Sequence, residues 1–333
     1  MQYNTAITEI NTVIEDIRNH DSLLIYRDIG GVGDAVMITG AIAGLKRQLP
    51  DVKIIMATIP YCVPVFINNP NVDYIIDSSQ FDRIHADGAV DYGSGKEICK
   101  VLFERNGSMF IGLSHQCPSA VYESSVEPKI IKSRQELFSE ACGTSFIKGD
   151  CRIYVTEEEI AFAKRTIPFK NYIVIHSKSN AKSRNLPNYH VDTLINKLTK
   201  RFPNSGVVVL SHDWKWKHKK NEQVIRVIES PLRAIIAIIA NADLLIGVDS
   251  MGCHVAGACG VPTYGIFGTV DPRTRLSAYH NATWYKGYNR CKRQPCWYHP
   301  CYFNFCMRSI SMNDVADDIV WFSKMAGLIG GVK

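Results

Sequence analysis

The chain has 333 residues, of which 46% are hydrophobic and 21% charged, and it carries a formal net charge of +6. Because this length exceeds what a single hydrophobic core usually serves, we expect two domains. No stretch approaches the roughly 18 consecutive apolar residues of a membrane-spanning helix, and the first residues lack the pattern of an export signal. These features argue against membrane insertion and secretion. They predict a cytoplasmic location, in which the eleven cysteines are reduced thiols or metal ligands rather than disulfides.

The first half of the chain alternates predicted strands and helices. A surface helix is expected over residues 7–17, where isoleucine and valine side chains fall on one helical face. The apolar run 22–29 predicts a buried strand, the glycine-rich "GGVGD" a turn, and residues 35–49 a helix. Residues 52–59 and 72–77 are predicted to form two further strands.

The second half repeats this scheme. A strand is predicted at 171–177 and an amphipathic helix at 190–202. The further predicted elements are a strand at 206–212, a helix at 232–242 with Ser230 as N-cap and Pro231 as first residue, and a strand at 243–249. Two such series predict an α/β protein with two parallel sheets, each covered by helices, and the domains are expected to meet near residues 150–170.

The stretch "GVDSMGCHVAGACG" follows the last of these strands. Asp249 ends the strand and Ser250 is predicted to cap the next helix, which runs to Gly260. Ligands of parallel sheets bind at this edge, where exposed N–H groups of a helix N-terminus attract anions, so the stretch predicts a phosphate-facing turn. The spacing of Cys253, His254 and Cys259 suits neither a metal site nor an activated thiol.

Several segments together resemble the bacterial heptosyltransferase family, the ADP-heptose:lipopolysaccharide type. "GVDSMGCHVAGACGVPTYGIFGTVDP" is similar to that family's signature, although Met251 separates Ser250 from the glycine that usually follows it. "GGVGDAVMITGAIAGLKRQLPDVKI", "FINNPNVDYIID", "IVIHSKSNAKSRNLPNYHVDTLINKLTKRF" and "CMRSISMNDV" are similar to its other blocks. The likeness covers residues 22–77 and 171–320.

The resemblance implies a GT-B glycosyltransferase, with two Rossmann-like parallel-sheet domains facing a cleft. An acceptor-binding domain is expected at 1–160, a donor-nucleotide-binding domain at 161–310, and a C-terminal helix crossing back to the first domain at 311–333. The family's general base corresponds to Asp34, for which a helix-capping role is the alternative. The donor, a nucleotide-diphosphate sugar, is expected to be held by Ser179, Lys182, Arg184, Asp249, Ser250, Gly252 and His254. The implied transfer is inverting and requires no cofactor.

A dinucleotide-binding interpretation of "GGVGDAV" is disfavoured. Val36 lies where the third glycine of that fingerprint should fall, and no acidic residue ends the following strand. A nicotinamide-dependent oxidoreductase is therefore not expected.

Four cysteines recur at a spacing of five residues near the C-terminus. Cys291, Cys296, Cys301 and Cys306 could supply a tetrahedral site for a structural zinc or iron, and some relatives of the family hold iron with cysteines in this region. Buried, reduced thiols are the alternative.

The acceptor is left open between two classes. Residues 271–310 contain seven lysines and arginines against one acid, interleaved with aromatic residues, a composition that can hold phosphates and stack on bases. The family resemblance implies a saccharide acceptor, whereas this basic window is consistent with a phage-type enzyme that glycosylates a hydroxymethylated DNA base. A non-catalytic, metal-stabilised nucleic-acid-binding protein is the third interpretation.

Overall fold

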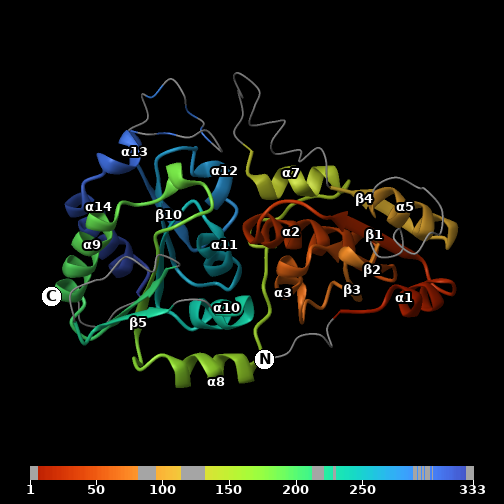
Figure 1. The fold of residues 1–333 in the computed structure, drawn as a ribbon, viewed down its shortest axis with the longest axis horizontal. Helices are drawn as coiled ribbons and strands as arrows, with labels where there is room; N and C mark the ends of the chain where they lie inside the picture. Colours follow the sequence, from red (N-terminus) through yellow and green to blue (C-terminus); the bar gives the residue numbers. More distant parts are fainter. Residues whose placement is uncertain are drawn as a thin grey trace. The chain divides into compact units, whose positions relative to one another are not determined.

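The computed structural model describes residues 7–81, 95–113, 132–211, 221–227, 230–287 and 303–327, together with Cys291, Gln294, Cys296 and Cys301. The chain divides into two compact units, Met1–Tyr154 and Val155–Lys333 (Figure 1). Each unit is an α/β structure built on one parallel sheet. The assignment of acceptor binding to 1–160, of donor binding to 161–310 and of a crossing helix to 311–333 stays a prediction.

Unit 1 contains a four-stranded parallel sheet in the order β3-β2-β1-β4. Its strands are β1 (Ser22–Arg27), β2 (Lys53–Thr58), β3 (Tyr74–Asp77) and β4 (Met109–Gly112). Its helices are α1 (Ile10–Ile17), α2 (Val32–Gln48), η2 (Pro60–Cys62), α3 (Val63–Phe66), α5 (Gly95–Arg105) and α7 (Arg134–Ala141). β2 pairs with one side of β1, and β4 pairs with the other side. The strand order therefore switches direction at β1.

The apolar periodicity of the first helix is confirmed over Ile10–Ile17, although the helix begins at Ile10 and not at residue 7 as predicted. Ile10, Val13, Ile14 and Ile17 of α1 are buried and pack into a core with the strands and with α5. The second helix begins three residues earlier than predicted, at Val32, because Gly31 serves as its N-cap and Asp34 already lies in its first turn. The strand before it is shorter than predicted and ends at Arg27.

Unit 2 contains a six-stranded parallel sheet in the order β10-β9-β8-β5-β6-β7. Its strands are β5 (Tyr172–His176), β6 (Gly206–Leu210), β7 (Val224–Val227), β8 (Leu244–Val248), β9 (Thr263–Phe267) and β10 (Ala282–Lys286). Its helices are α8 (Glu157–Thr166), η3 (Lys182–Arg184), α9 (Asn188–Arg201), α10 (Leu232–Ala240), α11 (Met251–Ala258), α12 (Arg273–Leu276), α13 (Phe305–Arg308) and α14 (Met312–Met325). The order switches direction between β5 and β8, the place where open α/β sheets bind ligands.

The helices of unit 2 are fixed by apolar packing and by one buried ion pair. α14 lies beside α9 and shares its core, in which Val315, Ala316 and Ile319 are fully buried (Figure 1). Glu159 of α8 accepts from the guanidinium of Arg233, which is completely buried in α10. The cap of α10 differs from the prediction. Pro231, and not Ser230, is its N-cap, and Leu232 is its first residue. Within the described residues, no helix combines the length and apolar character needed to cross a bilayer.

Candidate active site

The carboxyl edge of the unit 1 sheet is shaped by the tight turn between β1 and α2. Gly30 adopts a φ of +91°, which favours glycine. A Cβ atom at this position would lie 2.5 Å from Nη2 of Arg27 and 2.8 Å from Oδ2 of Asp34. The absence of a side chain at Gly30 therefore lets these two charged groups meet directly above the end of β1.

Asp34 lies between two arginines. Nη2 of Arg27 is 3.2 Å from Oδ2 of Asp34, and Nη1 of Arg134, at the start of α7, is 2.9 Å from Oδ1. The Asp34 side chain is 16% exposed. Since the N-cap of α2 is Gly31, Asp34 is not the capping residue. Two guanidinium groups favour the charged form of a carboxylate, and its exposure leaves it open to a hydroxyl of a substrate.

The two arginines are held differently. Arg27 is only 3% exposed, donates through Nη1 to the backbone oxygen of Leu113 at 2.8 Å, and places its guanidinium over the Phe138 ring. Arg134 is 17% exposed, and a capping box between Ser133 and Glu136 fixes the start of its helix. Arg27 is therefore a rigid partner of Asp34, and Arg134 an accessible one.

Two further side chains lie near this turn, at the end of β2. The Tyr61 hydroxyl donates to the backbone oxygen of Gly30 at 2.6 Å. Burial raises the pKa of Cys62 to about 12, so this thiol is protonated at neutral pH and is not an activated nucleophile.

In unit 2, the turn from β8 to α11 carries the residues predicted to face phosphate. Asp249 follows β8 directly, and Ser250 is the N-cap of α11, as expected from the sequence. A hydrogen bond of 2.9 Å joins the Ser250 hydroxyl to Nδ1 of His176 at the end of β5. A Cβ at Gly252 would lie 2.5 Å from that same nitrogen, so glycine is what permits the helix to approach β5.

Asp249 also lies between two arginines. Nη1 of Arg184 is 3.0 Å from its Oδ2, and Nε of Arg275 is 3.5 Å from its Oδ1. The Asp249 and Arg275 side chains are 5% and 3% exposed, and that of Arg184 is 20% exposed. This ionic group is therefore more deeply buried than the one around Asp34.

The remaining predicted donor residues are distributed around this group. The backbone N–H of Ser179 donates to Oδ1 of Asn185 at 2.7 Å, which shapes the loop that carries Lys182 and Arg184. Lys182 is exposed, and Arg184 is the member of this loop that reaches Asp249. His254 is buried, and a hydrogen bond of 3.2 Å joins its Nδ1 to the Tyr279 hydroxyl. Nearby Cys253 is buried and donates to the oxygen of Val248, which agrees with its predicted inert character.

Sequence reasoning missed three side chains of this edge. They are His176, Arg275 and Lys286, of which Lys286 donates to the backbone oxygens of Gly268 and Val270 at 3.1 and 2.8 Å. Burial lowers the pKa of the Lys286 ammonium, and the charges of Asp271 and Asp249 act in the opposite direction. The signal that could have identified His176 and Lys286 is their position at the carboxyl ends of strands.

The four cysteines of the C-terminal ladder lie among the described residues. The backbone N–H of Cys296 donates to the oxygen of Thr269 at 3.1 Å, which attaches the ladder to the loop after β9. Burial raises the pKa of the Cys306 thiol, Lys286 lowers it, and the charges of the other three cysteines raise it. Across the described parts of the chain, no group of three or more His, Cys, Asp or Glu side chains is arranged to hold a metal ion.

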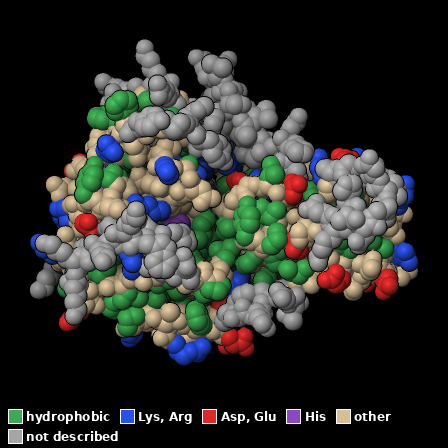
Figure 2. All heavy atoms as spheres, in the orientation of Figure 1, with side chains coloured by type: hydrophobic (Ala, Val, Ile, Leu, Met, Phe, Trp, Pro, Cys, Tyr) green, Lys and Arg blue, Asp and Glu red, His purple; other side chains and the backbone are tan. Residues whose placement is uncertain are grey.

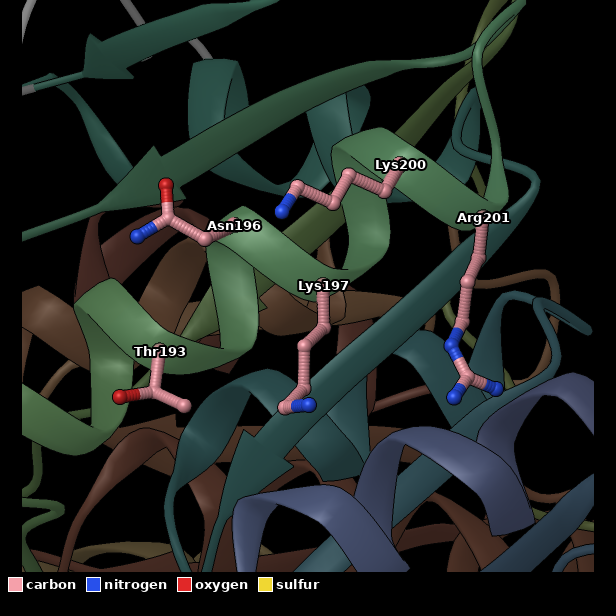
Figure 3. A pocket seen from close by; sticks show the side chains of 5 residues that line it. All are labelled: Thr193, Asn196, Lys197, Lys200 and Arg201. Carbon is pink, nitrogen blue, oxygen red and sulfur yellow. The ribbon is translucent and has the colours of Figure 1, made fainter.

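Much of the basic window lies outside the described residues. Arg290, Lys292, Arg293, Trp297 and Tyr298 belong to those segments, as does the lysine-rich stretch at 212–220. A separate basic hollow lies on the outer face of α9 and is lined by Thr193, Asn196, Lys197, Lys200 and Arg201 (Figure 3). Because α9 runs back from the carboxyl edge of the sheet, this hollow lies away from Asp249.

Comparisons with known proteins agree with this architecture. The family model "Glycosyltransferase family 9 (heptosyltransferase)" matches residues 112–303. Among curated proteins, none matches the chain. ADP-heptose lipopolysaccharide heptosyltransferase II of E. coli is similar in structure, with a TM-score of 0.67 and 15% identity over 92% of this chain and 99% of that one.

Two other solved structures share the fold. A family 9 glycosyltransferase from Veillonella parvula has a TM-score of 0.67 and 13% identity over 91% of this chain and 97% of that one. The iron-containing dodecameric glycosyltransferase TibC from enterotoxigenic E. coli has a TM-score of 0.62 and 13% identity over 92% of this chain and 77% of that one.

The two parallel-sheet units and these structural matches define the GT-B fold class. The match of the family model to more than half of the residues identifies the family. The chain belongs to glycosyltransferase family 9, the heptosyltransferase family.

Proposed function

We propose that the protein transfers a heptose-like sugar from a nucleotide-diphosphate sugar to a hydroxyl of a saccharide acceptor, with inversion at the anomeric carbon. The observation that carries this proposal is the arrangement at the carboxyl edge of the unit 2 sheet. Asp249 lies next to the N-terminus of α11 and pairs with Arg184, whose buried Nε has no hydrogen-bond partner among the described residues. A diphosphate would accept from the helix N–H groups and from this guanidinium.

The donor roles follow from the geometry of each side chain. Ser250 and Gly252 hold the α11 turn against His176, which leaves the first N–H groups of the helix for the diphosphate. Asp249, fixed by Arg184 and Arg275, is proposed to accept from hydroxyls of the donor sugar. Ser179, Lys182 and His254 are assigned to the donor on the family resemblance. The E. coli heptosyltransferase WaaC, with a TM-score of 0.58, has been solved with ADP-2-deoxy-2-fluoro heptose, so ADP-heptose is the first donor to try.

Asp34 is proposed as the general base. As the acceptor oxygen attacks the anomeric carbon, its proton passes to the Asp34 carboxylate. The bond from that carbon to the diphosphate oxygen breaks, and the electron pair leaves with the diphosphate. Cationic and N–H groups of unit 2 offset the charge that develops on the leaving group.

A saccharide acceptor is preferred to DNA for a specific reason. The DNA interpretation rests on the basic aromatic window, whereas the E. coli enzyme of similar fold is named for a lipopolysaccharide acceptor. The two differ in salt dependence, because a DNA enzyme would displace counterions from phosphates. We expect DNA binding to be weak at 150 mM salt, and replacement of Lys292 and Arg293 by alanine to leave sugar transfer intact. A cytoplasmic location stays a prediction.

A structural metal on the cysteine ladder is a second part of the proposal. Four thiols are suitable ligands for zinc or iron, and TibC is an iron-containing relative in fold. In the described structure these side chains are not arranged around an ion, so a bound metal would draw them together. Bound to four thiolates, a metal would fix the loop after β9 without an open position for catalysis. Elemental analysis of the purified protein tests this, with Cys306→Ser expected to lose the metal and Cys142→Ser to retain it.

The central test is a panel of nucleotide sugars. Each sugar is incubated with the protein and a saccharide acceptor, and the products are separated by mass spectrometry. NMR of the product gives its anomeric configuration, for which inversion is expected. Failure to bind or turn over any nucleotide sugar would contradict the proposal.

A further inference from the structure

The Tyr61 side chain is exposed yet held in one place. Its hydroxyl donates to the backbone oxygen of Gly30 at 2.6 Å, while 56% of the residue remains exposed. It belongs to η2, where Pro60 fixes the backbone and the following Cys62 and Val63 are buried. An exposed tyrosine would usually sample several rotamers, so this arrangement presents an aromatic ring whose orientation is already set.

The ring lies beside the proposed general base. Gly30, which accepts from Tyr61, is the residue whose missing Cβ leaves space for Asp34. The charges of Arg27 and Asp34 both influence the phenol: burial and Asp34 raise the pKa of Tyr61, and Arg27 lowers it. Tyr61 and Asp34 therefore border the same small region at the carboxyl edge of unit 1.

Beside the Asp34 carboxylate, this turn also exposes an apolar side chain. Ile29, in the same turn, is 40% exposed. In Figure 2, hydrophobic side chains gather on the visible face over the region where Figure 1 draws α2 and α3. A sugar ring has matching properties, since its C–H groups form apolar faces and its hydroxyls project from the rim.

From this geometry we infer that Tyr61 is a specificity-determining residue that contacts the acceptor, with its ring as a platform for the C–H face of the acceptor sugar. This inference rests on the proposed function. The attacking hydroxyl would then point from the rim of the sugar toward Asp34. Because the ring is already oriented, little conformational entropy is lost when the sugar binds.

A nucleobase could also stack on this ring, but the charges favour a sugar. Arg27 and Arg134 both pair with Asp34, and Arg27 also acts on the Tyr61 phenol. A nucleic-acid strand would require cations for its phosphates at the same place. We therefore assign a saccharide to this ring, and the experiment below also tests whether a nucleobase binds there.

Two substitutions separate the ring from its hydroxyl. Tyr61→Phe keeps the ring and removes the bond to Gly30, whereas Tyr61→Leu keeps apolar bulk and removes the ring. Trp321→Leu is the matched control, since Trp321 is a similarly exposed aromatic residue on the outer face of α14. Circular dichroism and thermal unfolding establish that all three variants are folded.

The variants are compared in transfer from the donor found with the panel to a deacylated core oligosaccharide from a heptose-deficient lipopolysaccharide. For Tyr61→Leu we expect the acceptor KM to rise about 10-fold with the donor KM unchanged. For Tyr61→Phe the acceptor KM should stay within about twofold of the original value. Saturation-transfer NMR of the oligosaccharide, without donor, should show the same order of binding.

The inference is overturned if Tyr61→Leu leaves acceptor binding and KM unchanged, or if Phe and Leu cause equal losses, since the hydroxyl alone would then be responsible. It is also overturned if a hydroxymethylated single-stranded oligonucleotide, rather than the oligosaccharide, binds in a Tyr61-dependent manner. If the oligosaccharide neither binds nor accepts sugar, both the inference and the proposal of a saccharide acceptor are contradicted. Donor binding and hydrolysis by the same protein would still support the transferase.

Discussion

The two units contain the same ionic arrangement at different depths. In each, a carboxylate follows a central strand and lies between two arginines: Asp34 with Arg27 and Arg134, and Asp249 with Arg184 and Arg275. The Asp34 side chain is 16% exposed and the Asp249 side chain 5%. Because the partners are alike, local charge alone does not account for the different roles proposed for the two carboxylates.

Exposure is the difference between the two carboxylates, and the proposed roles follow from it. A carboxylate that takes a proton from a substrate must be reached by that substrate, which suits Asp34. Removing a deeply buried carboxylate takes a charged partner away from buried guanidinium groups, and water replaces it poorly. Loss of Asp34 should therefore affect turnover, and loss of Asp249 should affect folding as well as donor binding.

The largest effect is expected for Asp34→Asn. The amide keeps the shape and can still contact one arginine, but it cannot accept the acceptor proton at neutral pH. Turnover should fall by about 10³-fold, while donor affinity measured by calorimetry stays the same. Normal turnover combined with a lower unfolding temperature would instead assign Asp34 a structural role.

Asp249→Asn should act mainly on stability. Arg275, which is 3% exposed, would lose its charged partner, at a cost of about 3 kcal/mol in the free energy of unfolding measured in urea. The matched control is Asp317→Asn, which breaks an exposed pair with Arg201 and should cost less than about 1 kcal/mol. If the two variants lose the same free energy of unfolding, burial does not make the Asp249 pairs more important for stability than the exposed Asp317 pair.

The two arginines that pair with Asp34 should differ in their contribution to stability. Arg27→Gln removes a buried guanidinium that also binds the oxygen of Leu113, so we expect a loss of about 2 kcal/mol in unfolding free energy. Arg134→Gln removes the more accessible partner and should cost less than about 1 kcal/mol. Because Arg134 holds Oδ1 of Asp34 at 2.9 Å, Arg134→Gln should lower turnover while donor affinity stays the same. Unchanged turnover would show that Arg134 does not position Asp34.

The smallest effect concerns cysteine chemistry near Asp34. Burial raises the pKa of Cys62 to about 12, so its thiolate fraction at pH 8 is very small. Brief treatment with iodoacetamide at pH 8, after removal of any bound metal, should modify exposed Cys291 and leave Cys62 unmodified, as read by peptide mass spectrometry. Rapid modification of Cys62 would show that the Asp34 region opens more readily than its burial indicates.

What the sequence predicted well is local in the chain. The α11 turn was predicted from an apolar run followed by Asp249, Ser250 and small residues, all within one short segment. The periodicity of α1 likewise identified its buried face. Apolar periodicity and capping residues act over a few positions, so a single segment is enough to reveal them.

What the sequence did not predict depends on distant strands. Asp34 and Arg134 are 100 positions apart, and Ser250 and His176 are 74 apart. Their proximity requires the strand order and register, which no local pattern contains. The early start of α2 was missed for a different reason, since Gly33 in its first turn reduces the apparent helix signal although Gly31 is a suitable N-cap.

The order of strands in unit 2 also has a consequence for synthesis of the chain. β5 lies in the middle of the sheet and pairs with β8, for example Ile173 with Leu244. During translation, β5 and β6 therefore emerge long before the strand that covers the other side of β5. A parallel sheet with such separated partners folds slowly, because the intervening chain must be closed into a loop before the pairing can stabilise it. The edge that becomes the proposed donor site is thus completed only after residue 248 has left the ribosome, and until then β5 presents an unpaired edge to other nascent chains.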